Sequence, residues 1–201
     1  MFKKKITEQV LDAIEKSPGG IASLDVLMSL RICGSSTLKT TISRLNKTDR
    51  IIHLKRGTYS SNPIRDAFLC AQSTFNGYLG FSSALYLHGL ITELPFTISV
   101  VTAGKSGKKQ MGEYQFKAIS LKEKAVGFEK IGNKVVSSRA KTLFDCLYLP
   151  EYSIERQKLI GAYRDAGLSK KEWPEFDLYV EKFGGNKMGM MEKAKKEIRG
   201  D

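Results

Sequence analysis

The chain has 201 residues, enough for two small domains, and an ordinary share of apolar side chains argues against intrinsic disorder. No apolar run approaches the roughly 20 residues that cross a bilayer, and the lysine-rich start, Met1–Ile6, has no apolar segment behind it. These features favour a cytoplasmic protein without membrane contact, and the net charge of +12 favours a polyanionic partner.

The first third of the chain predicts three short helices. Apolar residues at helical spacing indicate a helix from about Thr7 to Lys16, which the breakers Ser17–Gly20 end. A second helix is expected over Ser23–Leu30, with its first serine as the N-cap. Gly34-Ser35 makes the next turn, and a third helix, capped by its own first serine, is expected over Ser36–Asn46.

The third predicted helix has an apolar face and a polar, cationic face. Leu38, Ile42 and Leu45 recur at i, i+4 and i+7 and should face the core. Short hydroxyl side chains on the opposite face would let the helix approach base edges, although a solvated face that contacts nothing is the alternative. We therefore predict major-groove contacts from Ser36, Thr37, Thr40, Ser43 and Arg44.

A small basic hairpin is expected directly after this helix. Ile51–Leu54 and Thr58–Ser60 read as strands, and Gly57 supplies the positive φ that a tight turn between them needs. Together these elements predict a DNA-binding winged helix-turn-helix over residues 1–62, which hold eleven Lys or Arg against five Asp or Glu. Phosphate contacts are predicted from Lys39, Lys47, Lys55 and Arg56.

Residues 63–201 predict a second, mixed α/β domain after a boundary at Ser60–Pro63, so the fold class is α+β. A small mixed sheet is expected to about residue 138 and a helical part from about 139. Ser82 is the expected cap of a short helix that Gly89 stops, and 103–109 is an expected basic loop. Strands are expected over 96–102, 113–120 and 135–138, and helices over 64–74, 139–147, 153–166, 169–183 and 187–199.

Metal, cofactor and phosphate-loop motifs are not indicated. The two histidines, His53 and His88, have no ligand at metal-binding spacing, and the three cysteines, Cys33, Cys70 and Cys146, are expected in the core. The run Gly104-Lys105-Ser106-Gly107-Lys108 does not complete a phosphate-loop motif. We therefore expect neither a metal nor a cofactor.

One catalytic alternative remains on a predicted strand. Glu113, Gln115 and Lys117 would share one face, which resembles the acid and lysine of Mg²⁺-dependent nucleases. Such a site also needs a second acid on a neighbouring strand, and the nearest upstream carboxylate, Glu93, precedes a Leu-Pro turn. A solvated polar face is the simpler interpretation, so we expect a non-catalytic protein.

Three segments resemble a known family. They are the wing Lys55-Arg56-Gly57-Thr58-Tyr59, the segment Tyr78–Leu90, similar to "YxS..SAL..HGL", and Lys141–Pro150, similar to "EKALxDxLxxP". In the last, Ala140 replaces the usual acid and Thr142 the usual alanine. Residues 1–150 together resemble the AbiEi family, the antitoxins and transcriptional regulators of AbiE-type (type IV) abortive-infection toxin–antitoxin systems.

The resemblance implies a repressor that binds inverted repeats in double-stranded DNA upstream of its operon. Residues 63–201 would form an antitoxin domain, paired in function with a nucleotidyltransferase-like toxin without a tight complex. A monomer or homodimer would place two copies on the duplex, since one winged helix reads only a short site. The alternatives are an orphan regulator, a protein- or RNA-interaction module that uses the basic loop Lys105–Lys109, and the nuclease.

Overall fold

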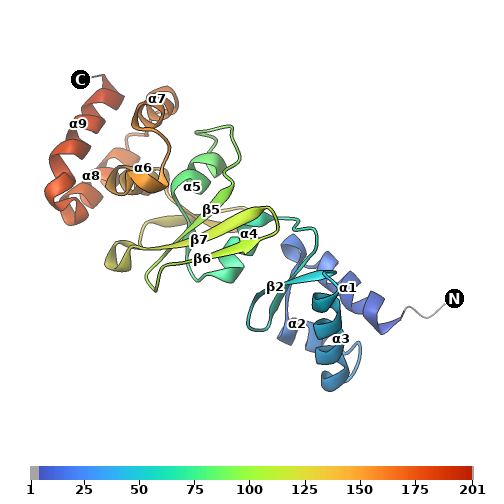
Figure 1. The fold of residues 1–201 in the computed structure, drawn as a ribbon. Coiled ribbons are helices and arrows are strands. Elements are labelled where there is room, and N and C mark those ends of the chain that lie inside the picture. Colours follow the sequence, from blue (N-terminus) through green and yellow to red (C-terminus); the bar gives the residue numbers. More distant parts are fainter. Residues whose placement is uncertain (1–4, 201) are drawn as a thin grey trace. The chain divides into compact units, whose positions relative to one another are not determined.

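Helices and two β-sheets form an α+β protein in the computed structural model, which describes residues 5–200 (Figure 1). The predicted fold class is therefore confirmed. Residues 1–4, which belong to the lysine-rich start discussed above, and residue 201 lie outside the described part. One compact unit contains the described residues up to Phe75 together with Gln110–Tyr114, and the other contains Asn76–Lys109 and the chain from Gln115 onward.

The first unit combines a helical cluster with a small antiparallel sheet. The helices are α1 (Ile6–Lys16), α2 (Leu24–Ser29), α3 (Ser35–Lys47) and α4 (Ala67–Thr74). The strands are β1 (Ile21–Ser23), β2 (Ile51–Lys55) and β3 (Thr58–Ser61), in the order β1-β3-β2. The three predicted helices and the hairpin are thus present within one or two residues of their expected bounds.

Apolar residues at helical spacing build the core of this unit. Its buried side chains include Val10, Ile14, Leu27, Leu38, Ile42, Leu45 and Ile51. Ser23 caps α2 as predicted, because its Oγ accepts a hydrogen bond from the Val26 N–H at 3.1 Å. The prediction that Ser36 caps α3 is wrong. The N-cap is Gly34, which has no side chain to offer, and Ser36 lies exposed within the first turn.

Helix α4 belongs to the first unit, although the sequence suggested a division after Asn62. Its buried residues Phe68, Cys70 and Ala71 are on a helix that contacts β2 and β3. The Cys70 Sγ lies 3.3 Å from the Ser60 Oγ on β3. Packing of α4 on the hairpin therefore carries the first unit to Phe75, beyond the Ser-Ser-Asn-Pro segment that marked the expected boundary.

A six-stranded mixed sheet has the order β6-β7-β5-β4-β9-β8. Its members are β4 (Tyr78–Leu79), β5 (Thr97–Thr102), β6 (Gly107–Met111), β7 (Tyr114–Ser120), β8 (Phe128–Ile131) and β9 (Lys134–Ser137). β5 runs parallel to β7, and β4 runs parallel to β9 and antiparallel to β5.

Three strands of this sheet were not predicted: the two-residue inner strand β4 and the two edge strands, β6 and β8. β6 begins inside the stretch 103–109, which was expected to be a loop, and β8 was not anticipated. Most side chains of each are exposed, so neither shows the alternation of apolar and polar residues that identifies a half-buried strand. Pairing with an inner neighbour, rather than local pattern, defines these edge strands.

The described part of the second unit also contains five α-helices (Figure 1). They are α5 (Phe81–Leu87), α6 (Arg139–Tyr148), α7 (Arg156–Ala166), α8 (Glu172–Phe183) and α9 (Met188–Arg199). α6 contacts both α5 and α8, and all residues from Ala140 to Leu147 are buried. Within residues 5–200, no helix has the length and apolar character needed to span a membrane.

Several local predictions in this unit can be compared with the structure. Gly89 follows the end of α5 with φ of +69°, as expected of a helix stop. Ser82 is not the cap of α5, because the helix already begins at Phe81 with Gly80 as N-cap. Among the cysteines, Cys70 and Cys146 are buried, as expected, and burial raises the pKa of the Cys70 thiol to about 11 and that of Cys146 to about 12. Cys33 is only half-buried.

Candidate nucleic-acid interface

Helix α3 presents a continuous polar face to solvent. Its buried residues, Leu38, Thr41, Ile42 and Leu45, share one side of the helix. The other side carries every residue predicted from this helix to contact DNA, and each of them is exposed: Ser36, Thr37, Lys39, Thr40, Ser43, Arg44 and Lys47. The helical spacing in the sequence therefore separated the core-facing residues from the solvent-facing ones correctly.

The electrostatics of α3 favour an anionic partner. Its 13 residues include three cations, Lys39, Arg44 and Lys47, and no carboxylate. In the described part of the chain, none of these three side chains forms an ion pair. The Thr40 hydroxyl donates to the Ser36 carbonyl oxygen at 3.0 Å, so in this conformation it offers a partner only its acceptor lone pairs.

The hairpin β2–β3 is tied to the start of α2. Lys55 pairs with Thr58, so the turn consists of Arg56 and Gly57, and Gly57 has φ of +71° as predicted. The Leu24 N–H donates to the Gly57 carbonyl oxygen at 2.8 Å. Arg56 is exposed at this turn, whereas Lys55 is half-buried. The turn is thus held by a backbone hydrogen bond and presents one exposed cation, Arg56.

A groove of about 230 Å³ separates α3 from the hairpin. It brings together two predicted contact residues, Lys39 and Ser43, with three residues that sequence reasoning did not include. The added residues are Asn46 of α3, His53 of β2 and Tyr59 of β3.

The structure explains how the three added groove residues come together. The His53 and Tyr59 rings face each other across the strand pair with centroids 5.3 Å apart. Asn46 could have been found from the sequence, since Lys39, Ser43 and Asn46 follow i, i+4, i+7 spacing. The positions of the His53 and Tyr59 rings, in contrast, follow only from the register of β2 against β3. Ser36, Thr37, Thr40, Arg44 and Lys47 do not line this groove and lie elsewhere on the exposed face of α3.

The residues of the nuclease alternative are separated by the strand boundary. Gln115 and Lys117 lie on β7, whereas Glu113 lies exposed in the turn that precedes it. Within residues 5–200, no group of three or more His, Cys, Asp or Glu side chains is arranged to hold a metal ion. The stretch Gly104–Lys108 runs into strand β6 rather than into the helix that follows a phosphate loop.

The histidine of the second unit is part of its packing. His88 follows α5, and its Nε2 lies 2.7 Å from the Ser137 carbonyl oxygen of β9. Burial lowers the pKa of this imidazole. A neutral ring that donates from Nε2 to the carbonyl therefore fits this position, and the histidine links α5 to the sheet.

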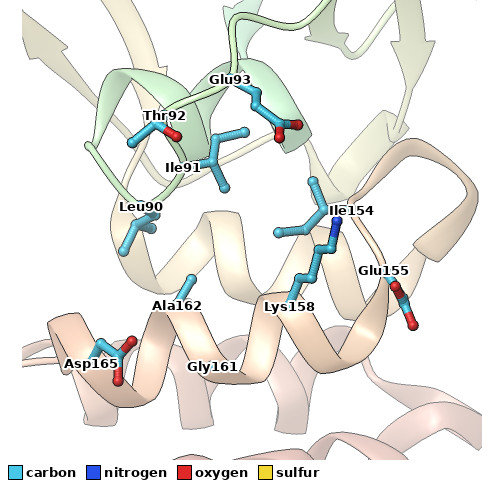
Figure 2. A pocket seen from close by; sticks show the side chains of 10 residues that line it. All are labelled: Leu90, Ile91, Thr92, Glu93, Ile154, Glu155, Lys158, Gly161, Ala162 and Asp165. Atoms are coloured by element: carbon cyan, nitrogen blue, oxygen red, sulfur yellow. The ribbon is translucent and has the colours of Figure 1, made fainter.

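A larger cavity of about 610 Å³ lies in the second unit between the segment after α5 and helix α7 (Figure 2). Ile91 and Ile154 lie toward its centre, while Glu155 and Asp165 lie toward opposite ends of α7. The remaining lining residues are Leu90, Thr92, Glu93, Lys158, Gly161 and Ala162. Three carboxylates against one ammonium would repel phosphates, so this cavity does not suit nucleic acid.

Comparison with known proteins leaves the family open. No protein-family model and no curated protein matches the chain.

Proposed function

We propose that this chain is a sequence-specific DNA-binding repressor with antitoxin activity, similar to the AbiEi regulators. In this proposal the first unit is a winged helix-turn-helix, with α3 as recognition helix and β2–β3 as wing. Double-stranded DNA with inverted repeats is the partner, and two copies occupy one operator. The observation that carries the proposal is the exposed face of α3, which has three cations and no carboxylate and lies beside the groove to the hairpin.

The distribution of side chains on α3 supports sequence reading rather than charge attraction alone. Serine and threonine hydroxyls occupy the middle of the exposed face and can approach base edges. Arg44 is the residue best suited to a bidentate contact with guanine. Lys39, Lys47, Lys55 and Arg56 would contact phosphates and fix the register of the helix.

The family-like segments support the antitoxin part of the proposal. Tyr78–Leu90 includes β4 and α5, and Lys141–Pro150 includes most of α6. Both contribute to one apolar core, in which Tyr78, Phe81, Leu85, Leu143 and Phe144 are buried. Because the residues of these motifs form the core, similarity in them favours a similar domain fold.

DNA binding can be tested with the full-length protein and a duplex from the region upstream of its own gene. Fluorescence anisotropy would compare this duplex with a scrambled duplex of equal composition, at salt from about 50 to about 200 mM. We expect tighter binding to the natural sequence at every salt concentration. Arg44→Ala should reduce the ratio of the two affinities by about tenfold, because it removes a base contact.

Phosphate contacts have a different signature, which provides the internal control. Arg56→Gln should weaken binding to both duplexes equally and lower the salt slope by about 1. Lys170→Gln removes the same charge from an exposed position in the second unit and should change neither the two affinities nor the salt slope. Equal affinity of the unmodified protein for both duplexes would refute the repressor, because attraction to phosphates does not depend on sequence.

A protein-interaction module is the second candidate function. The cavity in Figure 2 favours it, since an apolar floor with an acidic rim suits a polypeptide that carries aliphatic and basic side chains. This candidate would be favoured over the repressor by two results together. The unmodified protein would bind the natural and scrambled duplexes equally, and it would co-purify with the product of a neighbouring gene.

A further inference from the structure

A polar pocket of about 230 Å³ lies in the second unit and shares no lining residue with the groove beside α3. Its floor includes two residues from each of two neighbouring strands, Thr97 and Ser99 of β5 and Gln115 and Lys117 of β7. Tyr152 and the exposed Glu151 belong to the opposite wall.

The parallel pairing of β5 with β7 creates this polar surface. Thr97 is the register partner of Gln115, and Ser99 is the partner of Lys117. Since residues two apart on a strand point to the same face, the four side chains form a block of two by two. Alternate residues of the same strands, such as Ile98 and Phe116, are fully buried. The polar block therefore occupies one end of its face of the strand pair, and on the same face the next register pair, Val101 and Ile119, belongs to the apolar core.

These four side chains have no hydrogen-bonding partner among the described residues. The Lys117 ammonium also forms no ion pair there, and it lies over the Tyr152 ring, 4.3 Å from the centroid. Ser99 is buried, and the other three are half-buried. None of their side-chain nitrogen or oxygen atoms is both fully enclosed and unsatisfied, so these donors are open to a ligand that enters the pocket.

The wall that carries Tyr152 is held in place by its neighbours. The Ser82 hydroxyl donates to the Tyr152 carbonyl oxygen at 3.1 Å, and the Phe81 ring meets the Tyr152 ring edge-on at 5.5 Å. Phe81 is fully buried and has φ of +54°, a conformation that costs a bulky residue free energy and persists only where its surroundings impose it. The Ser82 hydrogen bond and the contact with the Phe81 ring therefore position Tyr152 beside the Lys117 ammonium.

We propose that this pocket binds one phosphate group, carried either by a mononucleotide or by the 5′ end of a nucleic-acid strand. One ammonium, two hydroxyls and an amide N–H₂ supply the charge and the donors that phosphate oxygens accept. The volume lies below the roughly 300–1,000 Å³ of sites for drug-sized ligands, which favours a small polar group. The exposed carboxylate of Glu151 on the opposite wall can accept a hydrogen bond from a sugar hydroxyl. The pocket has no residue in common with the proposed operator-binding residues, and this proposal does not rest on them.

Amide chemical shifts of the ¹⁵N-labelled full-length protein test the proposal directly. We expect both inorganic phosphate and adenosine 5′-monophosphate to shift the amide signals of Ser99 and Lys117. Each spectrum is compared with one recorded in chloride at the same ionic strength. Adenosine should not shift these signals. Lys117→Met should weaken binding of adenosine 5′-monophosphate by about tenfold or more, and Lys117→Arg, which keeps the charge, should retain most of it.

A matched variant separates this site from the basic surface in general. Lys108→Met removes the same charge from an exposed residue of β6 and should bind like the unmodified protein. A single strand with a 5′ phosphate can be compared with adenosine 5′-monophosphate and with the same strand lacking the phosphate. If the phosphorylated strand binds more tightly than both, and Lys117→Met removes this advantage, the ligand is a strand end. If the mononucleotide binds at least as tightly, it is the ligand.

Three results would overturn the phosphate site. The first is that phosphate and adenosine 5′-monophosphate leave the amides of Ser99 and Lys117 unshifted. The second is an equal loss of binding in Lys108→Met and Lys117→Met. The third is unchanged binding in Lys117→Met, whose fold the same spectra would verify.

Discussion

The Lys141–Asp145 ion pair is the least expected single feature of the molecule. Both side chains are fully buried in α6, one helical turn apart, and one oxygen of Asp145, Oδ2, has no hydrogen-bond partner in the structure. Burial raises the pKa of the Asp145 carboxyl to about 6 and lowers the pKa of the Lys141 amine, because each charge is removed from water. The Phe144 and Tyr179 rings lie 5.2 and 5.7 Å from the ammonium.

A double-mutant cycle should show that these two residues depend on each other. Lys141→Met or Asp145→Leu alone leaves a buried charge unpaired and should lower the free energy of unfolding by about 3–5 kcal/mol. The double variant should cost far less than the sum, since no charge then remains in the core. Urea denaturation measures all three, and simple additivity would show that the pair does not act as a unit.

At the scale of elements, helices were predicted well and edge strands poorly. Helix α3 follows from the spacing of Leu38, Ile42 and Leu45, which specifies a buried face without knowledge of its neighbours. β6 and β8 show no such pattern, because an edge strand leaves most side chains in water. The cap of α3 was misplaced by two residues, since the consecutive serines after Gly34 offer several equivalent starts.

The turn of the β2–β3 hairpin allows a test at this scale. Gly57 has φ of +71°, so Gly57→Ala should destabilise the first unit by about 1 kcal/mol. Gly57→Asn should cost less, because asparagine enters the left-handed region more readily than alanine. Urea unfolding followed at NMR signals of the first unit measures both. Equal stability of the glycine, asparagine and alanine proteins would contradict the role assigned to this turn.

At the scale of the whole molecule, the chain divides its chemistry between two units. The first carries the cationic helix α3 and the basic turn, and the second carries the phosphate-sized pocket and the acidic cavity. A repressor that is also an antitoxin would use such a division, with operator binding in the first unit and toxin neutralisation in the second.

The two proposed activities should therefore be separable in the full-length protein. Lys55→Ser combined with Arg56→Ser should abolish tight operator binding in anisotropy, because two phosphate contacts of the wing are lost. The same variant should still protect cells that express the proposed nucleotidyltransferase-like toxin. A Lys170→Ser, Lys171→Ser protein is the control for the change in charge. If the wing variant is folded and expressed but gives no protection, a separate antitoxin activity in the second unit is wrong.

The sequence by itself determined the helices and their exposed faces, because helical periodicity and breakers act over a few residues. It located Ser36, Thr37, Lys39, Thr40, Ser43, Arg44 and Lys47 on one side of α3, together with the turn at Arg56 and Gly57. Only the tertiary structure joined α4 to the first unit, brought His53 and Tyr59 into the groove and paired Thr97 and Ser99 with Gln115 and Lys117. Strand register and packing between distant segments decide those contacts, and no local pattern of residues encodes them.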